Sequence, residues 1–99
     1  MEFEWDEEKR EATLRKHGID FLRAAFSVFG GPHLRGSARS DIEPRETAIG
    51  EFDGVIVAII FTMRGESIRI ITARRARRHE RENYGSLFPR GDWPVRGPH

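Results

Sequence analysis

The side chains best suited to binding or catalysis lie in segment 68–84, where β-branched residues are followed directly by a run rich in arginine. Six of these seventeen residues are arginine, and Glu80 and Tyr84 stand four positions apart, so they share one face of a helix. Guanidinium groups bind phosphate oxygens in a fixed fork, while a carboxylate and a phenol can exchange protons. Together these residue types predict a site that holds a phosphodiester.

This set of side chains is suited to cutting RNA through its own 2′-hydroxyl group. A base removes the 2′-hydroxyl proton, guanidinium groups stabilise the charge that develops around phosphorus, and an acid protonates the leaving 5′-oxygen. Arginine stays protonated and cannot be the base. The candidates for the base are therefore Lys16, His17, His79 and Glu80. Tyr84 is a candidate for the acid or for stacking on a nucleobase.

The same residues also have structural interpretations. His17 precedes a glycine and could satisfy carbonyl groups at the end of a helix. Glu80 could pair along a helix face with Tyr84 or with Arg77. Tyr84 could be an aromatic residue at the edge of the core, with its hydroxyl in water. Residue types alone leave both interpretations open.

Two arginines at the expected strand–helix junction, Arg74 and Arg75, are open to two roles as well. One of them could form a structural ion pair with Glu4 or Asp6 while the other faces a substrate. Their spacing does not decide which arginine takes which role.

Composition indicates one small folded domain. The chain has 99 residues, of which 33% are charged and 37% are hydrophobic, which is in the globular range. The absence of cysteine excludes disulfides, a thiolate nucleophile and thiolate metal ligands. No apolar run is long enough to span a bilayer, and the first residues lack the basic and apolar regions of a signal peptide. We therefore expect a cytoplasmic protein with no membrane partner.

The net charge of +1 hides an uneven distribution of charge along the chain. Residues 1–20 carry seven acidic and four basic side chains, whereas residues 64–81 carry seven arginines and two glutamates. A basic surface of this kind fits a nucleic-acid partner, because local potential rather than net charge steers a ligand. The structural interpretation is a solvated helix whose arginines pair with its own glutamates.

Motifs for nucleotide or metal chemistry are missing. The sequence has no Walker-type lysine loop and no Gly-x-Gly-x-x-Gly. His79 precedes Glu80 but has no second histidine four residues later, so a zinc-protease helix is excluded. We expect no metal site and no cofactor.

The elements that must position these residues begin with a short edge strand at residues 3–5, which alternate apolar and polar side chains. Asp6 can cap a helix over about residues 7–17, and Gly18 can end it. This helix has few apolar residues, so much of it should stay wet or face a polar cleft.

A second helix should start at Asp20 and end at the sequence Gly-Gly-Pro of residues 30–32. Its apolar residues follow the spacing of a buried stripe, which consists of Phe21, Ala24, Ala25, Val28 and Phe29. We expect this helix to form part of the core.

The second half of the domain reads as a β-meander. A loop over about residues 40–44 and tight turns at Asp53-Gly54 and Arg64-Gly65 separate four strands, which we expect over residues 33–39, 45–52, 55–62 and 67–73. The nearly unbroken apolar run 55–62 belongs in the centre of the sheet.

Strict alternation in the last strand places Ile68 and Ile70 on one face and Arg69, Ile71 and Ala73 on the other. Arg69 is then a charged group on a surface that is otherwise partly apolar. From Gly85 onward the chain is rich in glycine and proline and has no periodicity. We therefore expect a domain over residues 1–84 and a tail over residues 85–99.

Four blocks of the sequence resemble the BrnT toxins of type II toxin–antitoxin systems. They are Phe3–Asp6, Leu14–Phe21, Ala25–Phe29 and Arg69–Ala76, the last followed by Glu80, Arg81 and Tyr84. They occur in the family's order over about residues 2–84, and the Lys16-His17-Gly18 and Arg69–Ala76 blocks are the most specific. Thr13 and Thr72 are mild departures, standing where such sequences often have Asn and Ser, and the tail has no counterpart.

The resemblance implies an α+β, RelE-like fold with a short N-terminal strand, two N-terminal helices, an antiparallel β-meander and a C-terminal helix. It also implies a metal-independent endoribonuclease toxin that cuts mRNA and inhibits translation. Its partner would be a cognate ribbon-helix-helix antitoxin, similar to BrnA, that wraps the toxin and represses the shared operon. Operator DNA would then be bound only through the antitoxin.

With this resemblance, the functional interpretation of the site residues is favoured. The predicted catalytic residues are Lys16, His17, Arg69, Arg74, Glu80 and Tyr84. The predicted substrate-binding residues are Arg64, Arg75, Arg77, Arg78 and Arg81. Within these sets, Arg69, Arg74 and Arg78 would position the scissile phosphate, and His17 or Glu80 would transfer the proton. The alternative function is a non-catalytic module that binds nucleic acid or protein, although no helix-turn arrangement for reading DNA is evident.

Overall fold

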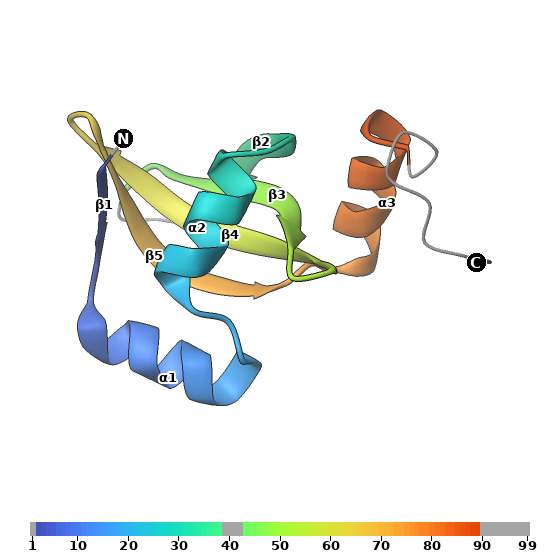
Figure 1. Cartoon of the computed structure of the whole chain (residues 1–99). Helices are drawn as coiled ribbons and strands as arrows, with labels where there is room; N and C mark the ends of the chain where they lie inside the picture. Colours follow the sequence, from blue (N-terminus) through green and yellow to red (C-terminus); the bar gives the residue numbers. More distant parts are fainter. Residues whose placement is uncertain (1, 39–42, 90–99) are drawn as a thin grey trace.

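The computed structural model describes residues 2–38 and 43–89, which form three helices and one five-stranded sheet (Figure 1). The helices are α1 (Glu7–His17), α2 (Phe21–Phe29) and α3 (Arg78–Leu87). The strands are β1 (Glu2–Trp5), β2 (His33–Ala38), β3 (Arg45–Phe52), β4 (Val55–Arg64) and β5 (Ser67–Arg75). This order of elements confirms the α+β class that the sequence predicts.

The strands lie in the order β1-β5-β4-β3-β2, with β4 in the centre. Strands β2 to β5 form the predicted antiparallel meander, and the apolar strand is central as expected. The short strand β1 lies at one edge, also as expected, but it pairs with β5 in parallel. The sheet is therefore mixed rather than wholly antiparallel.

Local capping explains why the first two helices have the bounds that the sequence predicts. The Asp6 side chain accepts a hydrogen bond from the backbone N–H of Glu8 (2.9 Å), and Asp20 caps α2 by accepting one from the N–H of Arg23 (3.1 Å). Gly18 ends α1 at a φ of +70°, a left-handed conformation that favours glycine.

Two apolar clusters lie on opposite faces of the sheet. The larger one joins the buried stripe of α2 to side chains of β3, β4 and β5, including Ala48, Ile59 and Phe61. The smaller one joins Tyr84 of α3 to Ile49 and to two alanines, Ala58 and Ala76. Successive strand residues point to opposite faces, which places α2 and α3 on different sides of the sheet. Figure 1 shows α2 crossing in front of the sheet and α3 beside its right-hand end.

A β-bulge in β5 makes the predicted alternation wrong for Ala73. Ile70 is paired with Phe61, but Thr72 is already paired with Ile60, so Ile71 is an extra residue between them. The bulge reverses the phase of the strand. Ala73 consequently joins Ile68 and Ile70 in the larger cluster.

The two predicted turns differ in how closely they match. Asp53 and Gly54 both have positive φ values, 54° and 83°, as a two-residue hairpin turn of type I′ requires. Strand β4 runs through Arg64, so the second turn consists of Gly65 and Glu66, one residue later than expected.

The C-terminal boundary also differs from the expectation. Helix α3 continues past Tyr84 to Leu87, and the ring of Phe88 packs 5.0 Å from that of Tyr84, measured between ring centroids. The predicted domain end at Tyr84 therefore falls inside a helix, and Gly85 is helical. The rest of the predicted tail, from residue 90, lies outside the described residues, as does much of the predicted loop 40–44.

None of the helices in the described ranges is long and apolar enough to cross a membrane.

Candidate active site

A polar groove lies between the first turn of α3 and the sheet face that α3 covers. It consists of two adjoining hollows of about 650 and 280 Å³, which share Ser37, Thr47, His79 and Glu80. The larger hollow is also lined by Ala38, Arg45, Ile60, Thr72, Arg74 and Arg77. We refer to the two hollows together as the α3 groove.

Strand pairing arranges the floor of the α3 groove in rows across β3, β4 and β5. Two complete rows are Thr47–Ile60–Thr72 and Ile49–Ala58–Arg74. Thr62 pairs with Arg69 in a third row, and Arg45 lies at its β3 end, two residues before Thr47. Paired residues of neighbouring strands point to the same side, so all nine side chains share one face. Thr72 and Arg74 reach this face only because of the bulge at Ile71, since unbroken alternation from Ile70 would turn both away.

The central contact of the groove is a two-pronged ion pair between Arg74 and Glu80. The two terminal nitrogens of Arg74 donate to the two carboxylate oxygens of Glu80, at 2.8 and 3.1 Å. The backbone N–H of Arg77 donates to Glu80 Oε1 as well (2.7 Å). The Glu80 side chain is only 13% exposed. One carboxylate thus fixes an arginine and caps the start of α3 at the same time.

Hydrogen bonds keep the Glu80 carboxylate charged. The guanidinium of Arg74 lowers the pKa of Glu80, burial opposes this shift, and the Arg77 N–H and nearby positive charge lower the pKa further. A carboxylate that accepts three hydrogen bonds and is held ionised is a poor proton acceptor. In the structure, Glu80 is the partner that holds Arg74 in place.

The same pairing answers the question about the junction arginines. The expected structural pair of Arg74 or Arg75 with Glu4 or Asp6 is wrong for Arg74, because its partner is Glu80. It is Arg69 that lies beside Glu4, with 3.7 Å between Arg69 Nη1 and Glu4 Oε1.

Backbone contacts fix where α3 begins. The N–H of Ala76 donates to the carbonyl of Ile56 (2.9 Å), which ties the junction to β4. The Arg81 side chain reaches back and donates to the carbonyl of Ala76 (2.7 Å). His79 and Glu80 consequently lie in the first turn of α3, and both line the two hollows of the groove.

Arg45 is a groove residue that the sequence did not single out. It begins β3, faces the same side as Arg74 and is 30% exposed. Its Nε is enclosed and has no hydrogen-bond partner among the described residues, and Glu43 Oε1 lies 3.8 Å away. The sequence carried one usable signal, since Arg45, Thr47 and Ile49 alternate in phase along the strand. The phase of β3 relative to β5 is set only by long-range pairing.

Several predicted site residues lie outside the groove. Lys16 and His17 are exposed at the C-terminal end of α1, a helix that contacts β5. Tyr84 is buried in the smaller cluster with 3% exposure. Of the predicted catalytic set, the structure brings together only Arg74 and Glu80 in the groove, while Arg69 shares the sheet face without lining the hollows.

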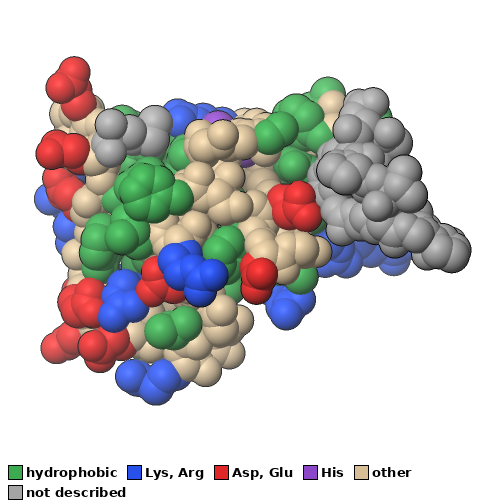
Figure 2. Space-filling model, viewed as in Figure 1, with side chains coloured by type: hydrophobic (Ala, Val, Ile, Leu, Met, Phe, Trp, Pro, Cys, Tyr) green, Lys and Arg blue, Asp and Glu red, His purple; other side chains and the backbone are tan. Residues whose placement is uncertain are grey.

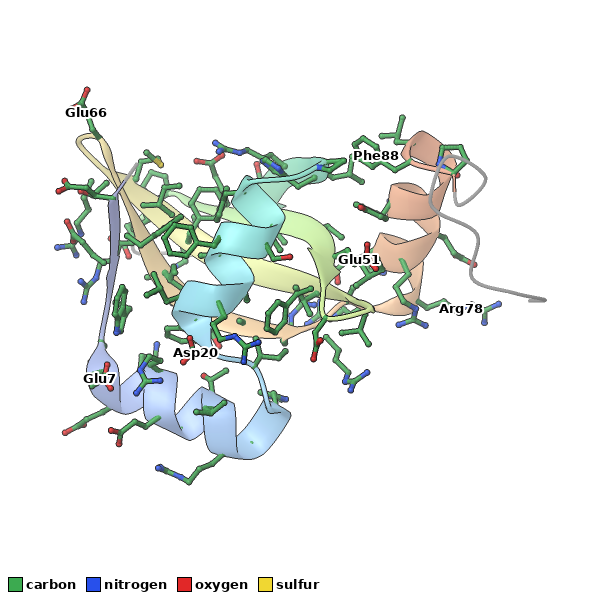
Figure 3. The ribbon with its side chains drawn as sticks, viewed as in Figure 1. Glu7, Asp20, Glu51, Glu66, Arg78 and Phe88 are labelled. Carbon is green, nitrogen blue, oxygen red and sulfur yellow. The ribbon has the colours of Figure 1, made fainter. Side chains whose placement is uncertain are left out.

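Of the predicted substrate-binding set, only Arg77 lines the groove. Arg64 lies at the hairpin end of β4, and Arg75 and Arg81 are exposed outside the hollows. Arg78 is 85% exposed, pairs with Glu82 at 3.5 Å and points away from the molecule (Figure 3).

The surface charge follows the asymmetry seen in the sequence. Figure 2 shows acidic side chains gathered at the left edge, over β1 and the start of α1, and basic side chains along the lower edge near α3. On the sheet face that α3 covers, the larger hollow is lined by Arg45, Arg74 and Arg77 and by one carboxylate, that of Glu80, so an anionic ligand is attracted there.

The described residues contain no group of three or more histidine, aspartate or glutamate side chains that could hold a metal ion.

The fold and this site together define a small α+β protein in which a fixed arginine lines a groove between the sheet and its C-terminal helix. Residues 5–80 match the model of a family described as "Ribonuclease toxin, BrnT, of type II toxin-antitoxin system". The chain therefore belongs to the BrnT family of ribonuclease toxins, which confirms the resemblance seen in the sequence. The match extends through Glu80 and so includes the Arg74–Glu80 pair. A comparison with curated proteins finds no match.

Proposed function

We propose that this chain is a metal-independent endoribonuclease that cleaves RNA in the α3 groove through the 2′-hydroxyl and thereby inhibits translation. The observation that carries the proposal is the Arg74 guanidinium, held by Glu80 in a groove that also contains His79. A fixed guanidinium stabilises developing negative charge without having to reorganise during the reaction. We also propose that the order of strands and helices belongs to the RelE-like type of toxin fold.

In the proposed reaction His79 is the base. It is the groove residue whose side-chain type exchanges protons most readily near neutral pH, and it lies next to the residue that fixes Arg74. His79 takes the 2′-hydroxyl proton, and the O2′–P bond forms. The P–O5′ bond breaks, and the 5′-oxygen leaves with a proton from a second donor. The products are a 2′,3′-cyclic phosphate and a free 5′-hydroxyl.

The competing bases lie on α1. His17 and Lys16 are exposed there, and either could act only if the RNA spans from the groove to the end of α1. Single substitutions separate these candidates. We expect His79→Ala to lower the cleavage rate on the order of a hundredfold, the low end of what general-base catalysis contributes. A large loss in His17→Ala or Lys16→Ala with a small one in His79→Ala would move the base to α1.

The test of the reaction uses the purified chain, freed of antitoxin, and a short RNA. Cleavage should persist in EDTA. The product should end in a cyclic phosphate, so phosphatase should remove the terminal phosphate only after acid has opened the ring. A substrate with a single 2′-deoxy nucleotide at the cleavage position should stay intact. Loss of activity in EDTA or a 5′-phosphate product would refute the mechanism. Absence of cleavage by the folded protein would favour a non-catalytic interaction module.

We further propose that a cognate ribbon-helix-helix antitoxin neutralises the toxin by covering the α3 groove. The arginines of the larger hollow, Arg45, Arg74 and Arg77, support this, since an acidic antitoxin segment would compete there with RNA phosphates. Contact with operator DNA would then come through the antitoxin. Hydrogen exchange of the toxin with and without antitoxin should show added protection at the start of α3 and along β5. Protection confined to α2 would contradict this placement.

A further inference from the structure

We propose that Arg45 forms a second anion subsite in the α3 groove, which binds the RNA phosphate next to the scissile one. The proposal deepens the proposed ribonuclease function and rests on it. It separates two duties within one groove: Arg74 acts at the reacting phosphate, and Arg45 holds a neighbouring phosphate that does not react.

The first observation is the position of Arg45. It lines the larger hollow together with Arg74. Arg45 is on β3 and Arg74 on β5, so β4 lies between them, and their rows are separated by the row Thr47–Ile60–Thr72. Strands are ~4.8 Å apart, which separates β3 from β5 by about 10 Å. The two arginines therefore enter one hollow from different strands, which allows them to contact different phosphates of the same RNA strand.

The second observation is the unsatisfied Nε of Arg45. This nitrogen is enclosed by protein, yet it has no hydrogen-bond acceptor among the described residues. Glu43 forms an ion pair with Arg45, but at 3.8 Å its Oε1 is beyond hydrogen-bond distance of this nitrogen. By contrast, Arg74 and Arg10 each have carboxylate oxygens within 2.8 Å. An enclosed donor without a partner is costly, and a turn of the side chain that brings Nε to a phosphate oxygen in the hollow would supply the missing acceptor.

The third observation is the fixed backbone beneath Arg45. Thr62, which is also buried, donates a hydrogen bond from its hydroxyl to the carbonyl of Pro44 (2.8 Å), directly before Arg45. This contact holds the start of β3 against the central strand. Arg69 occupies the other end of the same row, but its guanidinium lies toward Glu4 and it does not line the hollow. Arg45 is therefore the better-placed second contact.

A binding experiment tests the subsite independently of catalysis. The probe is a single-stranded 2′-O-methyl oligoribonucleotide, which the proposed reaction cannot cut, and its affinity is measured as a function of salt concentration. Each phosphate contact in a single strand contributes a slope of about 0.7 to log affinity against log salt. We expect Arg45→Gln to reduce the slope by about 0.7 and Arg45→Lys to restore most of it.

The matched control for binding is Arg23→Gln. Arg23 is exposed on α2, on the other side of the sheet, where it lies over the Phe52 ring, and its loss changes the net charge equally. We expect its slope to equal that of the wild type. Equal slopes for Arg45→Gln and Arg23→Gln would overturn the subsite. Thermal melting establishes that each variant is folded. If Arg45→Gln does not fold, Arg45→Lys is compared with the wild type instead. The subsite then predicts equal slopes but weaker binding for Arg45→Lys.

A cleavage experiment assigns the subsite to the non-scissile phosphate. The substrates are a dinucleoside monophosphate, which has only the scissile phosphate, and two trinucleotides made cleavable at one linkage each by 2′-deoxy substitution. We expect Arg45→Gln to raise KM at least severalfold for one trinucleotide and to lower kcat/KM of the dinucleotide less than that of this trinucleotide. An equal loss on all three substrates would place Arg45 at the scissile phosphate and overturn the proposal. If the wild type cuts none of them, the proposed function fails, while the binding experiment still decides the subsite.

Discussion

Arg74 differs from the other arginines of the 68–81 segment because both prongs of its guanidinium are bound to one carboxylate. Arg74 held in this way lines the larger hollow of the groove. This fixed orientation is what a lysine cannot reproduce, since an ammonium group is a point charge on a flexible chain. Position 74 should therefore depend on geometry as well as on charge.

We expect Arg74→Lys to lower kcat/KM for RNA cleavage on the order of a hundredfold, because the positive charge remains near Glu80 but the fork is lost. Arg74→Ala should lower kcat/KM further and should also melt at a lower temperature, since it leaves the mostly buried Glu80 carboxylate without its main donor. Steady-state cleavage assays measure the effect, and Arg23→Lys is the control for changing an arginine elsewhere. Near-wild-type rates in both Arg74 variants would place the reacting phosphate away from Arg74.

Two substitutions of Tyr84 distinguish a catalytic role of this side chain from a packing role. Its side chain is buried between α3 and the sheet, with Ile49 and Ala58 in the same cluster and the ring of Phe88 against it. We expect Tyr84→Phe to cleave RNA within a few-fold of the wild-type rate. Tyr84→Ala should lower the free energy of unfolding by about 3 kcal/mol, as large-to-small aromatic substitutions in cores do. A hundredfold loss of rate in a stably folded Tyr84→Phe would instead support the phenol as the acid.

Among the elements, strand β5 has the largest influence on the site. Its first half sends Ile68 and Ile70 into the α2 side of the sheet, and after the bulge its second half sends Thr72 and Arg74 to the α3 side. One extra residue therefore decides which face carries the candidate catalytic arginine. Bulges occur often beside active sites for this reason, because they re-aim side chains without breaking the sheet.

The contact between α2 and β3 depends on a glycine. A Cβ atom at Gly50 would lie 3.0 and 3.3 Å from the two γ-methyl carbons of Val28 on α2. We expect Gly50→Ala to lower the free energy of unfolding by about 1–3 kcal/mol, because overpacking pushes the helix from the sheet. Urea unfolding measures this. Gly36→Ala is the control for stability, since its Cβ would meet nothing within 4 Å. Equal stability of Gly50→Ala and the wild type would mean that α2 shifts freely.

At the scale of the whole molecule, an ion network joins the first helix to the second. Arg10 of α1 binds Glu7 of the same helix and Asp20, the cap of α2, through its guanidinium, with 2.6 Å from Arg10 Nη1 to Asp20 Oδ1. The hydrogen bond from Arg10, with a second from the Trp5 indole, lowers the pKa of Glu7 to about 2. Burial resists ionisation of Asp20, but bonds from the Arg23 N–H and from Arg10 outweigh it and lower the pKa of Asp20. Figure 3 shows Glu7 and Asp20 on the two sides of this junction.

These lowered pKa values predict the direction of acid unfolding. A carboxylate whose pKa is lower in the folded state stabilises the fold above its unfolded pKa, about 4, and loses that contribution as pH falls through the folded value. The free energy of unfolding should therefore drop between about pH 4 and pH 2. We expect Asp20→Asn to be less stable near neutral pH and to show a flatter decline in acid, because the amide still caps α2 but carries no charge.

Urea unfolding at a series of pH values measures this decline. Glu66→Gln is the control, since Glu66 projects from the tip of the β4–β5 hairpin (Figure 3). Parallel profiles for Asp20→Asn and the wild type would show that the Arg10 network does not couple α1 to α2 in the folded protein.

Patterns within the amino-acid sequence are enough to indicate the helices and strands of this protein and the types of residue in its candidate site. Asp6, Gly18 and Asp20 set helix bounds through contacts within a few residues, and Asp53-Gly54 set a hairpin through its own backbone preferences. The alternating and helical apolar patterns likewise gave the central strand and the core helix. Such features depend on neighbours along the chain, so the amino-acid sequence shows them directly. The arginine-rich segment and its family resemblance were visible for the same reason.

Which of these side chains meet depends on long-range packing. The bulge at Ile71 reversed the face of Arg74, and the pairing of β3 with β4 brought Arg45 into the same hollow. Glu80, a candidate base in the sequence, became the partner of Arg74, and Tyr84 became buried. Each outcome depends on the register between strands distant in the chain and on the angle at which α3 meets the sheet. Register and packing are set by burial of the whole core, which no local pattern encodes.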